Sequence, residues 1–180
     1  MEQEASREVL VAALRERGVA YLAPGDARAD GEPAIRANEL IARLAAQDDP
    51  RLKLALIPLF ILHPDLAQAV PPVVDALPEP ARSEAIAYYM AAVYLQRLWS
   101  VRLRFYLPEV ILLPDWFSEQ AGLPSPDERY GKVGLHARAE WHAARSSYQH
   151  NWLASYQRVM DQLFEQLKQE ARQREHASAG

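Results

Sequence analysis

ARSEAIAYYMAAVYLQRLWSVRLRFY, residues 81–106, is the stretch that decides the fold of this chain. Apolar side chains recur in it at intervals of three and four residues, a spacing typical of a helix. The apolar positions are Ile86, Met90, Val93, Tyr94, Leu98, Val101 and Phe105, with Leu95, Trp99 and Tyr106 to one side. Because a helix that is apolar on most sides belongs in a protein interior, the sequence predicts a central buried helix over 81–106.

The segments on either side of this stretch also carry helical patterns. A first helix is expected over about residues 3–17 and is expected to end at Gly18, because glycine adopts the left-handed conformation that commonly closes a helix. C-terminal helices are expected over 133–172, and the second of them carries a short heptad seam. The predicted fold is therefore all-α, with about six or seven helices packed around the central helix.

The length of 180 residues is suited to one domain with a sizeable core. Residues 1–32 are expected to form the first helix and a mobile loop, since Pro, Gly and Asp are frequent in the second half of this segment. Residues 173–180 are polar and are expected to fray. The predicted domain is a single helical unit over 1–172.

A helical hairpin is predicted between the first helix and the central helix. Asp49 and Pro50 form a typical helix start, and Pro58 is expected to kink the helix that follows. The sequence DPRLKLALIP, residues 49–58, resembles the Asp-Pro-x-Val-Arg-x-x-Ala opening of a HEAT repeat helix. The resemblance implies a HEAT-like hairpin over Asp49–Leu77, within the segment 33–77, on the N-terminal side of the central helix.

A single copy of this pattern occurs, whereas stable solenoids need several stacked repeats. The expected structure is therefore one HEAT-like hairpin inside a small helical domain. Hairpins of this kind commonly offer a groove for protein contacts, so the resemblance favours a protein-binding function.

Composition excludes several classes of function. A net charge of −4 argues against non-specific binding to nucleic acid, which needs clustered lysine and arginine. The absence of cysteine excludes disulfides, thiolate metal sites and cysteine nucleophiles. The polar, acidic start Met1-Glu2-Gln3-Glu4 is unlike a signal peptide, and no apolar run approaches the roughly 20 residues of a membrane span. The expected location is the cytoplasm, with no membrane contact.

Three histidines in the C-terminal region are the candidate metal ligands. His136 and His142 are six positions apart and face away from each other on a helix, while His150 lies two turns beyond His142. Helical metal sites use ligands at i and i+3 or i+4, as His136 and Glu140 are spaced, but one pair does not make a site. No metal site and no cofactor are predicted.

The segment RSSYQH, residues 145–150, contains an Arg-x4-His spacing. It resembles the Arg-x4–6-His signature of HEPN-domain ribonucleases, which are small all-helical proteins. The resemblance implies metal-independent RNA cleavage across a dimer, in which Arg145 holds the phosphate and His150 takes part in proton transfer. It also implies a nucleotidyltransferase antitoxin as the partner.

The central helix carries arginines but no acidic residue between Glu84 and Glu109. The arginines are Arg97, Arg102 and Arg104. A buried unpaired charge is costly, so these side chains are expected either to pair within the chain or to form an anion site or docking surface for an acidic partner. The in-chain partners considered are Asp115, Glu119 and Glu140, and the docking surface would include Tyr88 and Tyr89.

The leading functional hypothesis is a non-catalytic helical adaptor or accessory subunit that acts through protein contacts. The partner would be another protein, or a second copy of the chain bound through the helix at 147–172. The first alternative is the HEPN-like ribonuclease, whose substrate would be RNA. A weaker alternative is a helix-turn-helix regulator, which the acidic balance and the absence of a basic recognition helix disfavour.

Overall fold

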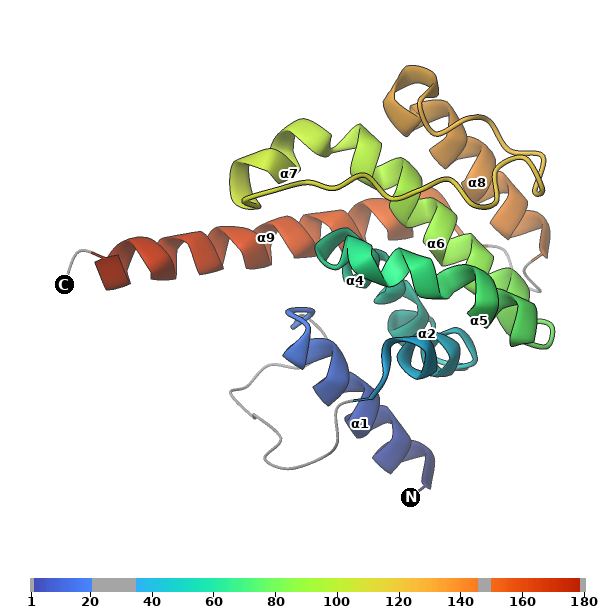
Figure 1. The fold of residues 1–180 in the computed structure, drawn as a ribbon, viewed down its shortest axis with the longest axis horizontal. Coiled ribbons are helices and arrows are strands. Elements are labelled where there is room, and N and C mark those ends of the chain that lie inside the picture. The colour runs from blue at the N-terminus through green and yellow to red at the C-terminus, as the bar shows by residue number, and fades with distance from the viewer. Residues whose placement is uncertain (1, 21–34, 146–149, 179–180) are drawn as a thin grey trace.

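The computed structural model describes residues 2–20, 35–145 and 150–178, so the expected mobile loop lies outside the described residues. The described part of the chain is helical without strands, which confirms the all-α prediction. The elements are α1 (Glu2–Glu16), α2 (Ala37–Ala45), α3 (Pro50–Leu54), α4 (Leu56–Leu62), the 3-10 helix η1 (Pro64–Ala69), α5 (Val70–Ala76), α6 (Ala81–Leu98), α7 (Ser100–Tyr106), the 3-10 helix η2 (Glu128–Gly131), α8 (Lys132–Arg145) and α9 (Trp152–Ser178) (Figure 1).

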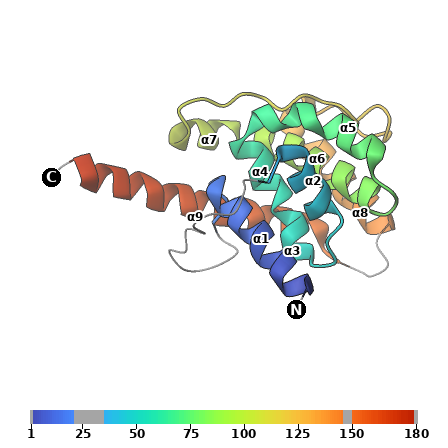
Figure 2. The same cartoon turned by 60° about the horizontal axis from the view of Figure 1, so that its bottom comes forward.

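Helix α6 is the central element, as the apolar pattern predicts. It contacts α2, α4, α5, α8 and α9, and Figures 1 and 2 show it enclosed by these helices. Every residue from Ala87 to Gln96 is buried. Aromatic rings fix its packing on two sides, since Tyr89 meets Phe60 of α4 edge-on at a centroid distance of 5.2 Å and Tyr88 meets His142 of α8 edge-on at 5.3 Å. The burial of α6 organises the whole hydrophobic core.

The predicted helix over 81–106 is broken at Trp99, whose φ of −105° and ψ of 14° are not helical. The expected interior stripe ends there, because Val101 and Phe105 are each 82% exposed in α7. After the break, the inward positions are Trp99, Leu103 and Tyr106, two of which pack their rings on Phe164 of α9. The prediction of a single helix over 81–106 was therefore wrong. The residues after the break form α7, which lies on the surface.

Prolines divide the hairpin region into more and shorter helices than expected. The helix expected to start at Asp49 and Pro50 breaks at Ala55 into α3 and α4, which places Pro58 in the first turn of α4. A first-turn residue has no intrahelical acceptor for its N–H, so a proline there removes no hydrogen bond. Pro71 and Pro72 lie in the first turn of α5 for the same reason. The predicted cap of α3 is confirmed, since Asp49 accepts a hydrogen bond from the N–H of Arg51 at 2.9 Å.

The end of α1 agrees with the prediction, whereas α9 extends beyond its expected end. Gly18 has a φ of +74° and closes α1 as predicted, with backbone hydrogen bonds from Gly18 to Arg15 and from Val19 to Leu14. Helix α9 continues to Ser178, so the described part of the expected frayed tail is helical. Figure 1 shows this end of α9 projecting beyond the packed helices.

Among the described residues, no one helix has both the length and the apolar character needed to cross a membrane. The segments Pro50–Leu62 and Pro64–Ala76 meet those requirements only together, and they are bent by 117° relative to each other. Residues 55–61 of this pair are buried in the hydrophobic core.

Polar side chains of α6 hold the irregular segment 107–127 against the core. Gln96 is fully buried, donates to the carbonyl of Ile111 at 2.8 Å and accepts from the N–H of Leu113 at 2.7 Å. The hydroxyls of Tyr89 and Tyr94 donate to the carbonyls of Pro114 and Pro124 at 2.6 and 2.7 Å. Because buried backbone groups need partners, these side chains replace the ladder that a strand or helix would supply.

Candidate functional site

Helix α7 presents two different faces. The inward face packs on α9 through Trp99, Tyr106 and Arg102, whose guanidinium carbon lies 3.9 Å from the ring centroid of Phe164. The outward face carries Val101 and Phe105, which are four residues apart and therefore neighbours on the helix surface. The helix thus uses one apolar side to join the fold and leaves a second apolar side in solvent.

We call the exposed residues Val101, Arg104 and Phe105 the α7 face. Val101 and Phe105 are each 82% exposed, and the two following exposed apolar residues, Ile111 and Leu112, are 55% and 47% exposed. Exposed large apolar side chains that recur along one element, beside a cation, are typical of an interaction surface. The α7 face is the strongest candidate interaction site among the described residues.

The three central arginines do not form one anion site. Arg97 pairs with Asp127 at 3.0 Å and donates to the carbonyl of Leu113 at 3.1 Å, so the in-chain pairing was right but the carboxylate is none of the three expected. Arg102 lies over Phe164, and Arg104 is exposed with no ion pair to the described residues. Of the three, Arg104 is the exposed arginine that neither pairs with a carboxylate nor stacks on a ring among the described residues, so it is the one best placed to attract an acidic partner.

Tyr88 and Tyr89 were expected on the docking surface, and the structure places both in the core with 0% exposure. Tyr89 donates to the carbonyl of Pro114, and Tyr88 packs edge-on against His142 at 5.3 Å. Their burial rules out direct contact with a partner. Tyrosine is common both in cores and at interfaces, so the sequence alone does not show which tyrosines of an apolar helix are buried.

Arg145 and His150 are both exposed, and residues 146–149 between them lie outside the described part. The Arg145 guanidinium carbon lies 3.7 Å from the ring centroid of Trp141, one turn earlier on α8. The Nε2 atom of His150 lies 2.6 Å from the hydroxyl of Ser155 in α9. Each side chain therefore contacts its own helix region, and both remain open to solvent.

A buried polar cluster that sequence analysis did not identify joins α6, α8 and α9. His142 stacks on Trp152 with ring centroids 3.6 Å apart, and its Nδ1 lies 2.7 Å from the hydroxyl of Tyr156. Its Nε2 lies 3.5 Å from Glu84, which in turn lies 3.7 Å from Lys53. Burial lowers the pKa of His142 below its ordinary value, which favours the neutral imidazole.

Arg138 is the most deeply buried charge of the described residues, with 0% exposure. Its Nε donates to the carbonyl of Ala87 at 3.0 Å, its guanidinium lies over Trp141 at 4.0 Å, and Nη1 and Nη2 have no hydrogen-bond partner within the described part of the chain. Burial lowers the pKa of Arg138 to about 10. Its position three residues after Leu135 and four before His142 is a core position of α8, so helical spacing could have identified it.

The polar side chains of the cluster that joins α6, α8 and α9 are closed off from solvent. Arg138 and Tyr156 are 0% exposed and His142 is 2% exposed, so a substrate cannot reach them in this conformation. The groups fix the relative positions of three helices rather than presenting a reactive surface. Within the described residues, no group of three or more His, Asp or Glu side chains could hold a metal ion.

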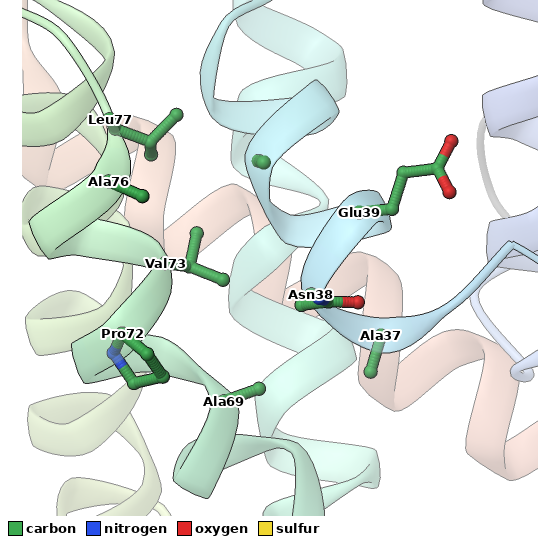
Figure 3. Close-up of a pocket in the computed structure, with 9 residues that line it drawn as sticks. Ala37, Asn38, Glu39, Ala69, Pro72, Val73, Ala76 and Leu77 are labelled. Carbon is green, nitrogen blue, oxygen red and sulfur yellow. The ribbon is translucent and has the colours of Figure 1, made fainter.

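An apolar groove of about 650 Å³ lies between α2 and α5, in the hairpin region. Figure 3 shows Val73 of α5 directed toward α2, while the carboxylate of Glu39 points away from α5. The lining residues are Ala37, Asn38, Glu39, Ala42, Ala69, Pro72, Val73, Ala76 and Leu77. This groove is a second apolar surface, on a different part of the fold from the α7 face.

The heptad seam of α9 is not available to a second copy of the chain. Tyr156, Met160 and Leu163 are 0% exposed and Leu167 is 2% exposed, because they pack on the rest of the domain. A dimer through 147–172 would therefore need the outer surface of α9, which is mostly polar.

Comparisons of the chain with protein-family models, curated proteins and solved structures find no match.

Proposed function

We propose that the protein is a non-catalytic helical adaptor that binds another protein through the α7 face. The observation that carries the proposal is the 82% exposure of both Val101 and Phe105 on a helix whose other side is packed on α9. Leaving large apolar side chains in water forgoes about 1.5–3 kcal/mol for each one that could be buried. A partner that covers them recovers this free energy.

The partner surface is apolar with an acidic margin. Phe105 and Val101 fit an apolar pocket or helix face, while Arg104 is the cation that an acidic side chain can pair with at the rim. The α7 face is rigid enough for selective binding, because Leu103 is 0% exposed and Arg102 lies over Phe164. A preorganised surface loses little conformational entropy on binding.

The variant Phe105→Asp tests this function. We expect it to weaken partner binding by at least about tenfold, since aromatic residues at the centre of an interface commonly cost 2 kcal/mol or more when removed. The free energy of unfolding should change by about 0.5 kcal/mol or less, because the side chain is 82% exposed. The measurement is quantitative co-purification from the native host, followed by titration with the purified partner.

Tyr130→Asp is the matched control, since Tyr130 is another exposed aromatic residue, at 79%, located in η2. A partner retained by the wild type and by the Tyr130 variant but lost by the Phe105 variant supports the adaptor. Equal retention by all three chains would show that the α7 face is not the binding surface.

The HEPN-like ribonuclease is the second candidate, and its specific support is the solvent exposure of both Arg145 and His150. If it is correct, the purified chain cleaves RNA without added metal, and both Arg145→Ala and His150→Ala reduce cleavage by at least about a hundredfold, the usual size of a general acid–base contribution. Phe105→Asp leaves that cleavage unchanged. Cleavage that persists in the two variants would come from another site or a contaminant.

We further propose that the segment 33–77 acts as a HEAT-like hairpin whose apolar groove between α2 and α5 is a secondary contact surface. The groove volume of about 650 Å³ and its nearly uniform apolar lining support this role. The HEAT-like character itself stays a prediction from the sequence resemblance.

A further inference from the structure

A second surface feature, separate from the α7 face, is a cavity of about 260 Å³ at the junction of α1, α3 and α9. Arginines from all three helices line it: Arg7 from α1, Arg51 from α3 and Arg158 from α9. These residues are far apart in sequence, so only the tertiary fold brings their charges to one place. In a chain with a net charge of −4, such a local concentration of positive charge needs a physical reason.

Among the side chains that the structure describes, in residues 6–20, 35–145 and 150–177, one carboxylate forms an ion pair with these arginines. Asp49 lies 3.6 Å from the Nε of Arg7, and its other oxygen is occupied by the N–H of Arg51. The side chains of Arg51 and Arg158 make no ion pair and no hydrogen bond with the part of the chain that the structure describes. Like charges held together without counter-charges repel each other, and an anion in the cavity would remove this repulsion.

The remaining lining adds hydrogen-bonding groups and an apolar base. Ser155 and Gln162 of α9 contribute a hydroxyl and an amide, while Leu54 and the buried Val159 contribute apolar surface. The volume is slightly below the range of about 300–1,000 Å³ for sites of drug-sized ligands. The cavity therefore has room for a small anion with a short polar organic part.

We propose that this cavity binds a small phosphomonoester through its phosphoryl group. Arginine is the side chain best suited to phosphate, because its planar guanidinium donates two parallel hydrogen bonds to phosphate oxygens. Arg51 and Arg158 hold the phosphoryl oxygens, Arg7 stands beside them in its ion pair with Asp49, and Gln162 hydrogen-bonds the organic part. None of these residues belongs to the α7 face, so the proposal is independent of the adaptor function.

The test is isothermal titration of the full chain with inorganic phosphate, glycerol 3-phosphate and uncharged glycerol. We expect saturable binding of glycerol 3-phosphate at one site and none of glycerol. Binding of inorganic phosphate as tight as that of glycerol 3-phosphate would assign recognition to the phosphoryl group alone and still support the site. Affinity should also fall as the salt concentration rises.

The variant Arg158→Gln should weaken glycerol 3-phosphate binding by at least about tenfold, the effect of losing charge-assisted hydrogen bonds. Arg51→Gln is a second variant with the same expectation. Arg104→Gln is the matched control, because Arg104 is also exposed and makes no ion pair with the described residues but lies on α7. Absence of saturable binding by both phosphate probes, or equal affinity in the Arg158 and Arg104 variants, would overturn the proposal.

Discussion

Replacing Gly134 by alanine is expected to lower the free energy of unfolding by about 3 kcal/mol, the upper end of the usual cost of overpacking a core. Gly134 lies in the first part of α8, where a Cβ atom would overlap ring atoms of Tyr94 in α6. The ring cannot move aside easily, because Tyr94 is 0% exposed and its hydroxyl donates to the carbonyl of Pro124. Urea denaturation of the two chains measures the difference.

The sign of this effect is informative by itself. Alanine stabilises a helix interior by about 1 kcal/mol relative to glycine when space is free. A more stable Gly134→Ala variant would therefore contradict the close approach of α6 and α8. Gly122→Ala is the control: Gly122 has a φ of +63° but no atom within 4 Å of the position of a Cβ, so the cost there is the backbone strain alone, about 1 kcal/mol.

Stability is expected to fall steeply above pH 10, by about 3 kcal/mol per pH unit. Burial raises the pKa of Tyr89, Tyr94 and Tyr156 well above the ordinary value of 10. Above pH 10 the unfolded chain releases these protons and the folded chain keeps them, so each tyrosine lowers stability by about 1.4 kcal/mol per pH unit. Arg138 has a pKa of about 10 and loses its proton more readily in the folded chain than in the unfolded chain. Its deprotonation therefore raises stability with pH in this range and offsets the contribution of one tyrosine.

Urea denaturation at several pH values between about 8 and 11 measures this slope, and tyrosinate absorbance follows ionisation directly. Tyr89→Phe removes one of the three groups and should reduce the downward slope by about 1.4 kcal/mol per pH unit. An unchanged slope in this variant would mean that Tyr89 ionises freely in the folded protein. The readout is the slope, so the loss of the hydrogen bond from Tyr89 to Pro114 does not obscure it.

Features of the fold that depend on local chemistry could be predicted from the sequence. Gly18 closes α1 and Asp49 caps α3 because the responsible groups are within a few residues of each other. The break at Trp99 could not be predicted, since no proline or glycine marks it and the contact that accompanies it is the packing of Trp99 and Tyr106 on Phe164 of α9. That contact is long-range and absent from any local pattern.

The same distinction applies to the candidate sites. The sequence identified Arg97 as a charge that needs a partner, but the partner, Asp127, is 30 residues away and is brought close only by the path of the segment 107–127. The arginine cavity combines Arg7 and Arg158 from opposite ends of the chain, and no spacing rule connects them. Arg138 occupies a core position of α8, yet residue type argued against burial there.

The break at Trp99 also makes the outward face of α7 sensitive to chain length. Each residue of an α-helix turns the chain by about 100°, so one residue inserted between Trp99 and Val101 would rotate every later side chain by that angle. Leu103 would leave the interior, and other residues of α7 would take the exposed positions that Val101 and Phe105 occupy. The buried residues 87–96 of α6 precede the joint and would keep their register, so a change of length at this point would alter the outward side chains of α7 and remove Leu103 from the core without shifting the centre of α6.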